Sequence, residues 1–163
     1  MPLTTEQVAT LRAAILADPA LAAWRQERRD DMIADYYNQP ASPAFSVWRN
    51  DVRVEEIGNA WVGTDIDGMS ALNMQRLQLL LASSPSGVFD MTRADRRAGF
   101  EGPFGTTVNN ASRVAMRAAW KRTLTRVERL FASGTGSDAT PGVTTYYGTV
   151  TTGEISNILN AVN

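Results

Sequence analysis

The chain has 163 residues, of which 44% are hydrophobic and 20% are charged, as in a globular protein with one well-formed core. It contains no cysteine and no histidine, which excludes disulfide bonds and thiolate metal sites and removes the commonest general base. No apolar run approaches the roughly 18 residues that span a membrane, and the N-terminus lacks the pattern of a signal peptide. We therefore expect a protein that is not an enzyme, with no catalytic residues, no cofactor, no bound metal and no membrane contact.

The N-terminal part predicts two successive helices. Thr4, followed three residues later by Gln7, has the pattern of a capping box at a helix start. This helix is expected to end at Asp18, because a residue before a proline disfavours the helical conformation. A second helix is expected from about Ala20 to Tyr37.

The middle of the chain predicts several short elements. Residues 45–48 alternate apolar and polar side chains, which fits either an extended segment or a short helix. A short helix around residues 52–60 and a loop at residues 63–68 follow. The helix expected next, about residues 69–82, is expected to be the most buried segment, because it carries Met69, Leu72, Leu77, Leu80 and Leu81. A short basic helix is expected over residues 93–100.

A long helix is predicted from about Asn110 to Ala132. Apolar side chains recur on one stripe, namely Val114, Trp120, Leu124, Val127 and Phe131. The other face carries the basic residues Arg113, Arg117, Lys121, Arg122, Arg126 and Arg129. This basic face is a candidate interface, because it offers positive charge to phosphates or to the acidic surface of a partner subunit. Since no aromatic side chains are interleaved with it, any contact with DNA would be independent of sequence.

The C-terminal part predicts a linker and an arm. Residues 134–142 have the composition of a flexible linker, and the β-prone run Val143–Val150 follows. Thr151 with Glu154 forms a second capping box, which opens a final helix. Such an arm either folds back on its own domain or reaches a neighbouring subunit. Its candidate interface residues are Tyr146, Tyr147, Ile155, Ile158 and Leu159.

Together these elements predict a mainly α fold, with a helical core, a short β element and a C-terminal arm. The expected organisation is a helical domain of residues 1–133, a linker of residues 134–142 and an arm of residues 143–163. The side chains expected in the core include Leu77, Leu80, Trp120, Leu124 and Val127.

Charge is spread unevenly along the chain. Residues 1–92 hold 7 arginines against 12 acidic residues, a net charge of −5, whereas residues 93–163 have a net charge of +4. Such a chain can associate head to tail with a copy of itself, although the same pattern also arises on an ordinary solvated surface.

Three motifs are similar to functional sites, but their residues predict ordinary structure. Asp65 to Gly68 is similar to part of a calcium loop, but the first and twelfth positions would be Gly63 and Met74, which supply no carboxylate. Residues 134–137 lack the lysine and the preceding strand of a phosphate-binding loop. The paired carboxylates of Asp30-Asp31 and Glu55-Glu56 are adjacent on predicted helices and therefore point in different directions.

A set of short motifs, spread over nearly the whole chain, carries a resemblance to a known group of proteins. The motifs are Leu3–Gln7, Ala17–Leu21, Asn38 with Ser42–Phe45, Val47–Arg49, Arg76–Gln78, Trp120–Arg122, Ala132–Gly136, Gly148–Thr151, Ile155 and Leu159-Asn160. In these the chain resembles small virion-associated proteins of tailed bacteriophages and prophages. In size and helical content it is also similar to the head–tail adaptor proteins that ring the portal.

This resemblance implies a structural protein of the virion, made in the host bacterial cytoplasm, and most simply an adaptor or connector ring subunit of the neck. The implied partners are copies of itself in a ring, the portal, and other neck or tail proteins, with packaged DNA as a further alternative. A second class stays open, namely a tail assembly chaperone or another morphogenesis factor that is absent from the mature particle.

Overall fold

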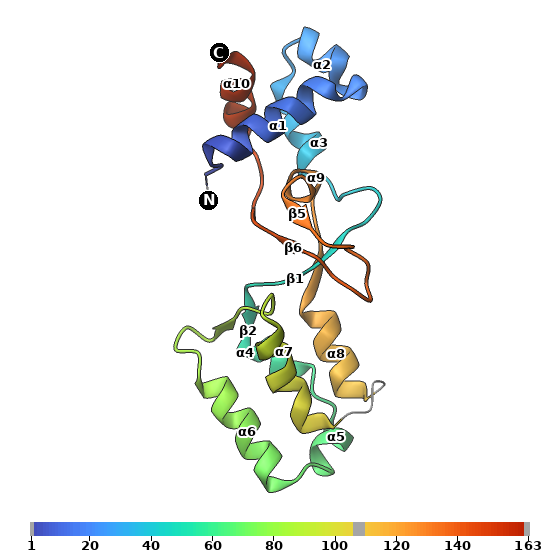
Figure 1. Cartoon of the computed structure of the whole chain (residues 1–163), viewed down its shortest axis with the longest axis vertical. Coiled ribbons are helices and arrows are strands. Elements are labelled where there is room, and N and C mark those ends of the chain that lie inside the picture. Colours follow the sequence, from blue (N-terminus) through green and yellow to red (C-terminus); the bar gives the residue numbers. More distant parts are fainter. Residues whose placement is uncertain (1, 106–109, 162–163) are drawn as a thin grey trace. The chain divides into compact units, whose positions relative to one another are not determined.

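The computed structural model describes residues 2–105 and 110–161. Over these residues it contains ten α-helices, two 3-10 helices and six short strands, so the predicted mainly α fold with a short β element is confirmed. The chain forms two compact units, most of whose elements are labelled in Figure 1. Unit 1 comprises Met1–Val47 and Thr123–Asn163, and unit 2 comprises Trp48–Arg122. Unit 2 is therefore an insertion in the sequence of unit 1. These two units differ from the predicted organisation, which was a helical domain of residues 1–133, a linker of residues 134–142 and an arm of residues 143–163.

Unit 1 contains mostly helices from the two ends of the chain. Its elements are α1 (Thr5–Ala17), a 3-10 helix (Pro19–Leu21), α2 (Ala22–Gln26), α3 (Asp30–Asn38), α9 (Arg126–Arg129), β5 (Ala132–Ser133), β6 (Val143–Thr144) and α10 (Thr152–Asn160). Strands β5 and β6 pair antiparallel, with Ala132 opposite Thr144. The capping boxes of Thr4 with Gln7 and of Thr151 with Glu154 both form, which confirms the predicted starts of α1 and α10.

The predicted helix from Ala20 to Tyr37 is wrong, because the chain forms three separate elements there. Asp18 caps the 3-10 helix through its side chain, and α2 ends at Gln26. Arg28 then has a φ of 54°, in the left-handed region, where a non-glycine residue interrupts a helix. Helix α3 starts afresh at Asp30.

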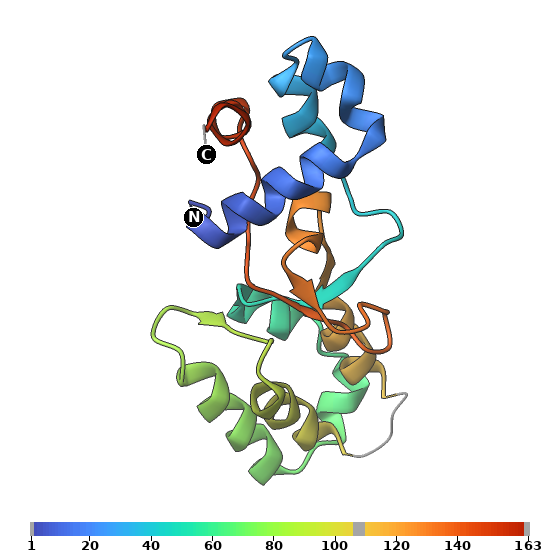
Figure 2. The same ribbon diagram turned by 45° about the horizontal axis from the view of Figure 1, so that its top comes forward.

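The core of unit 1 joins residues from both ends of the chain. Its buried side chains are Leu11, Ile15, Leu21, Ile33, Ala34, Tyr37, Val127, Tyr146, Val150, Ile155 and Ile158. Helix α10 lies beside α1 in Figures 1 and 2. Asn38 at the end of α3 fixes the approach to α10, since its side-chain amide exchanges hydrogen bonds of 2.8 and 2.9 Å with the backbone of Val150. The C-terminal arm therefore packs on its own chain.

Unit 2 is a continuous segment of short helices. Its elements are β2 (Val52–Arg53), α4 (Val54–Asn59), α5 (Gly63–Asp67), α6 (Ala71–Ala82), β3 (Val88–Phe89), α7 (Ala94–Glu101), a 3-10 helix (Gly102–Phe104) and α8 (Ala111–Ala119). Strands β2 and β3 pair antiparallel, with Val52 opposite Phe89. Residues 63–67, which the sequence predicted to be a loop, form the short helix α5. The chain passes from unit 1 to unit 2 within β1 (Ser46–Trp48) and returns within β4 (Lys121–Thr123). Because β1 is a strand, residues 45–48 are mainly extended and not helical.

The core of unit 2 is rich in aromatic side chains and methionines. It contains Val52, Ile57, Ala60, Leu77, Phe89, Met91, Phe100, Phe104, Met116 and Trp120. The rings of Phe89 and Phe100 meet edge to face with centroids 5.1 Å apart. Of the five core residues predicted from sequence, Leu77 and Trp120 are buried here and Leu124 and Val127 are buried in unit 1, whereas Leu80 is only partly buried.

The predicted long helix from Asn110 to Ala132 is wrong. Helix α8 ends at Ala119, with Trp120 as its C-cap, and β4 follows directly. A new helix, α9, begins where Thr125 and Glu128 form a capping box. Because α8 stops at Ala119, Val114 and Leu124 lie in different elements and do not share one helix stripe. Val114 is 53% exposed.

The segment predicted as a flexible linker, residues 134–142, packs against unit 1. The backbone carbonyl of Gly136 accepts a hydrogen bond of 2.7 Å from the Ser46 amide, and the Gly142 amide donates one of 2.9 Å to the Ser46 carbonyl. Both glycines lie against the ring of Phe45. Composition alone predicted a linker, but small residues here allow a loop to cover an aromatic ring closely.

Candidate interaction surface

The basic residues predicted to form one helix face are distributed over three elements. Arg113 and Arg117 lie in α8, Lys121 and Arg122 in β4, and Arg126 and Arg129 in α9. The first four belong to unit 2 and the last two to unit 1. The six basic residues therefore do not form the single continuous helix face on which the predicted contact with DNA depended.

Arg113 and Arg117 hold a buried carboxylate of unit 2. Arg117 donates hydrogen bonds of 2.6 and 2.7 Å from Nε and Nη2 to the two oxygens of Glu101, and Arg113 Nη2 donates one of 2.9 Å to Oε2. Burial by itself would raise the pKa of the Glu101 carboxyl, but the hydrogen bonds from both arginines outweigh it and lower that pKa below its ordinary value. These arginines therefore join α7 to α8 within one unit.

Arg126 and Arg129 lie over aromatic rings of unit 1. The guanidinium carbon of Arg126 is 3.9 Å from the ring centre of Tyr36, and that of Arg129 is 4.0 Å from the ring centre of Phe45. Such cation–π contacts fix the orientation of both side chains. The two arginines thus have a structural role within the fold.

Most of the predicted interface residues of the arm are buried in unit 1. Tyr146, Ile155 and Ile158 are at most 4% exposed and belong to its core, so the prediction that they form an interface is wrong for this fold. The periodicity of α10 identified its apolar face correctly, but it could not tell which chain that face contacts. Tyr147 and Leu159 are partly buried, and Leu159 also lines a surface cavity.

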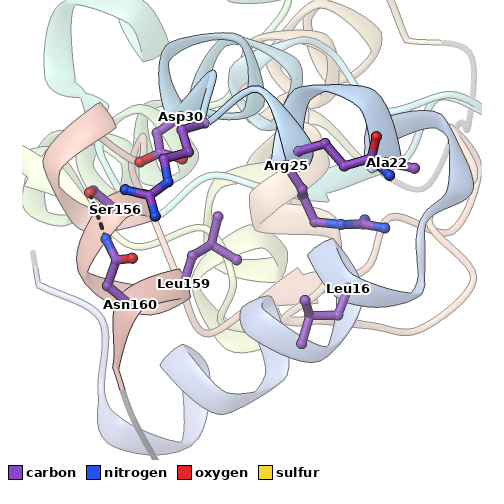
Figure 3. Close-up of a pocket in the computed structure, with 9 residues that line it drawn as sticks. Leu16, Ala22, Arg25, Asp30, Ser156, Leu159 and Asn160 are labelled. Atoms are coloured by element: carbon purple, nitrogen blue, oxygen red, sulfur yellow. Dashed lines mark hydrogen bonds between the residues drawn. The ribbon is translucent and has the colours of Figure 1, made fainter.

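This surface cavity lies between α1, α2 and α10 and has a volume of about 450 Å³. Figure 3 shows Leu16 and Leu159 projecting toward it from α1 and α10, with Arg25 and Asp30 on the wall formed by residues 22–30. The Arg25 guanidinium is anchored by hydrogen bonds to the backbone carbonyls of Ile15 and Asp18, at the end of α1. The cavity therefore combines an apolar floor with a charged rim.

A further candidate surface is the outer face of α6, which includes Leu72. It is formed by Leu72, Gln75, Arg76, Leu79 and Ala82, all of which are exposed. Leu72 and Leu79 are 58% and 65% exposed, whereas Leu77, on the opposite side of the helix, is fully buried. The prediction that Leu72 is buried is therefore wrong.

The sequence shows that this face of α6 is apolar, but not that it is exposed. Leu72 and Leu79 are seven residues apart, which places them on the same side of a helix two turns apart. Leu77, Leu80 and Leu81 lie on another side, so α6 carries leucines nearly all round and its sequence alone does not reveal which leucines contact the core.

Within residues 2–105 and 110–161, no group of three acidic side chains is close enough to hold a metal ion. No helix in the same residues is long and apolar enough to cross a membrane.

Comparisons of the chain with protein-family models, with curated proteins and with solved structures found no match. The resemblance to phage proteins, which rests on short sequence motifs, therefore stays a prediction.

Proposed function

We propose that the protein is a non-enzymatic structural subunit of a tailed-phage particle, of the head–tail adaptor type, which binds protein partners through the outer face of α6. The observation that carries the proposal is the exposure of Leu72 and Leu79 on one side of that helix. The sequence resemblance to virion-associated proteins supplies the biological setting.

The composition of this face supports a protein partner. It contains two leucines, an alanine and a glutamine around a single charged residue, Arg76. Protein interfaces are depleted of Lys, Asp and Glu at their centre and enriched in Arg, while apolar side chains supply the buried area. Covering a leucine fully is worth about 1.5–3 kcal/mol, so the two leucines together can contribute several kcal/mol to binding.

The face is also rigidly held, which lowers the entropy lost on binding. Ser70 caps α6 through a hydrogen bond from the Asn73 amide to its hydroxyl oxygen, and Asn73 Nδ2 donates to the Pro103 carbonyl at 3.1 Å. On the inner side Leu77 is buried in the core of unit 2. A partner therefore meets a preformed surface.

The test uses phage particles produced with the Leu72→Ser/Leu79→Ser variant as the only copy of the protein. We expect the wild-type protein in purified particles by mass spectrometry and at least a tenfold loss of the variant. Gln78→Ser is the matched control, because Gln78 is an exposed residue of α6 that does not belong to its outer face. This variant should enter particles normally. Thermal unfolding of both purified variants should match that of the wild type, because the substituted side chains are exposed.

Two results would contradict the proposal. If the wild-type protein is absent from purified particles, it is not a virion subunit, and an assembly chaperone or morphogenesis factor becomes the better assignment. If the double variant is folded and enters particles at the wild-type level, the outer face of α6 is not the interface.

A further inference from the structure

The outer face of α6 has a complementary surface on unit 1 of the same protein. Helix α1 buries Gln7, Leu11 and Ile15 on one side. Its opposite side is exposed and is formed by Glu6, Ala9, Ala13 and Leu16, which we name the outer face of α1. Leu16 is 52% exposed, so this face also leaves a large apolar side chain in contact with solvent.

We infer that the outer face of α6 in one copy packs on the outer face of α1 in a second copy. This inference rests on the proposed function of a virion subunit that binds protein partners through α6. The two helices have 13 and 12 residues and are each close to 20 Å long, so the faces match in length. Leucines project from α6, whereas alanines at the centre of the α1 face let another helix approach.

The charges on the two faces are opposite. Glu6 is the charged residue of the α1 face, and Arg76 is the charged residue of the α6 face. Neither side chain has an ion-pair partner within the described residues. Pairing two α6 faces would instead bring two Arg76 side chains to one interface, so the charges favour the heterologous contact.

The cavity next to the α1 face gives a leucine of α6 a place to bind. Leu16 belongs both to that face and to the floor of the cavity, together with Leu159 (Figure 3). A volume of about 450 Å³ is large enough for a leucine side chain, and the rim residues Arg25 and Asp30 would surround the apolar contact. The opposite charges of the two faces and the cavity beside α1 therefore both favour the outer face of α1 in a second copy as the partner of the outer face of α6.

A contact between two different faces is heterologous, because each copy keeps one free α1 face and one free α6 face. Repeating it adds subunits in one direction and generates a ring or a filament, not a closed pair. The outer faces of α1 and α6 are thus the two different faces that a ring subunit needs.

The test uses disulfide crosslinking, for which a chain without cysteine is well suited. Full-length Ala13→Cys and Gln75→Cys proteins are prepared separately, mixed and oxidised, and the products are separated on non-reducing gels. We expect a mixed disulfide dimer from the mixture and no dimer above background from either protein alone. The matched control replaces Ala13→Cys by Ala139→Cys, an exposed residue of unit 1 outside the α1 face, and should give background only.

Charge reversal then tests the pairing of Glu6 with Arg76. Glu6→Arg or Arg76→Glu alone should lower the crosslinking yield about two- to fivefold, the range of an exposed ion pair. Combining the two reversals should restore it.

Three crosslinking results would overturn the inference: no mixed dimer above the control, a dimer from Ala13→Cys alone, or a dimer from Gln75→Cys alone. If Leu72→Ser/Leu79→Ser still abolishes entry into particles while no mixed dimer forms, the proposed function survives, but the partner of α6 is a different protein. If the mixed dimer forms with protein that never enters particles, self-association holds and the virion role fails.

Discussion

Gly136 lies directly against the aromatic ring of Phe45, so closely that a Cβ atom at residue 136 would overlap the ring. Gly136 also has a φ of 64°, a conformation that residues with a side chain rarely adopt. The same ring contacts the guanidinium of Arg129, and the Ser46 amide bonds to the Gly136 carbonyl. This contact fixes the loop of residues 134–142 on unit 1.

Gly136→Ala should destabilise unit 1 by about 1–3 kcal/mol, because the added methyl group forces the ring or the loop to move and the left-handed backbone adds strain. Urea denaturation followed by circular dichroism measures the change. Gly153→Ala is the control, since nothing lies within 4 Å of a Cβ atom there and the residue is in α10. An alanine at residue 153 should leave stability unchanged or raise it slightly. Equal effects of the two changes would mean that the loop does not contact Phe45.

Leu77→Ala and Leu79→Ala should have very different effects, although the residues are two positions apart in α6. Leu77 is fully buried and its truncation should cost about 2–5 kcal/mol. Leu79 is 65% exposed, so its truncation should change the free energy of unfolding by no more than about 0.5 kcal/mol. Chemical denaturation of both variants checks the orientation of α6, and similar losses would show that the outer face is assigned to the wrong side.

Glu101→Gln should lower the stability of unit 2 near neutral pH by about 3 kcal/mol, because it leaves Arg113 and Arg117 facing a neutral amide. The pKa of Glu101 is lower in the folded than in the unfolded protein, so its contribution is present above the unfolded pKa of about 4.3 and is lost as the pH falls through the folded pKa. The difference between wild type and variant should therefore shrink below about pH 4.3. Glu55→Gln, at an exposed residue, serves as the control with little effect at any pH. A difference that is independent of pH would contradict the ionised state of Glu101.

Removing residues 143–163 should unfold unit 1, because its core includes Tyr146, Ile155 and Ile158 from that segment. The milder change Ile155→Ala should cost about 2–5 kcal/mol, whereas Asn157→Ala, at an exposed position of the same helix, should have little effect. Thermal unfolding and circular dichroism measure both. If the truncated protein keeps its helix content, residues 143–163 are not part of this core. They would then be expected to contact a neighbouring subunit.

Local signals predicted the starts of α1 and α10. The capping boxes at Thr4 and Thr151 depend on residues three positions apart, so the sequence contains all that is needed to recognise them. The same signal at Thr125 with Glu128 was overlooked within the predicted long helix, although it marks the start of α9. The apolar periodicity that continues across this break predicted Val114 on the same stripe as Trp120 and Leu124, but Val114 is exposed.

The distribution of side chains between core and surface was harder to predict. Whether Leu72 or Leu77 faces inward depends on how α6 packs against α7 and the 3-10 helix of Gly102–Phe104, which the periodicity of α6 alone does not show. Likewise, the periodicity of α10 fixed which residues are apolar, but the burial of Ile155 depends on contacts with α1 and α3. The candidate surface on α6 therefore required the tertiary structure, because it consists of the leucines that the core does not use.

The discontinuity of unit 1 also determines the order in which the protein can fold during translation. Unit 2 is continuous, so all of its residues have been made once Arg122 is added to the growing chain. Leu11, Ile15 and Ile33, by contrast, lack their partners Val127, Tyr146 and Ile155 until the C-terminal segment has been synthesised. Domains generally fold as units as they emerge from the ribosome. The N-terminal helices must therefore stay with their apolar faces uncovered while unit 2 folds, and this interval is the one in which the nascent chain is most exposed to aggregation and to chaperones.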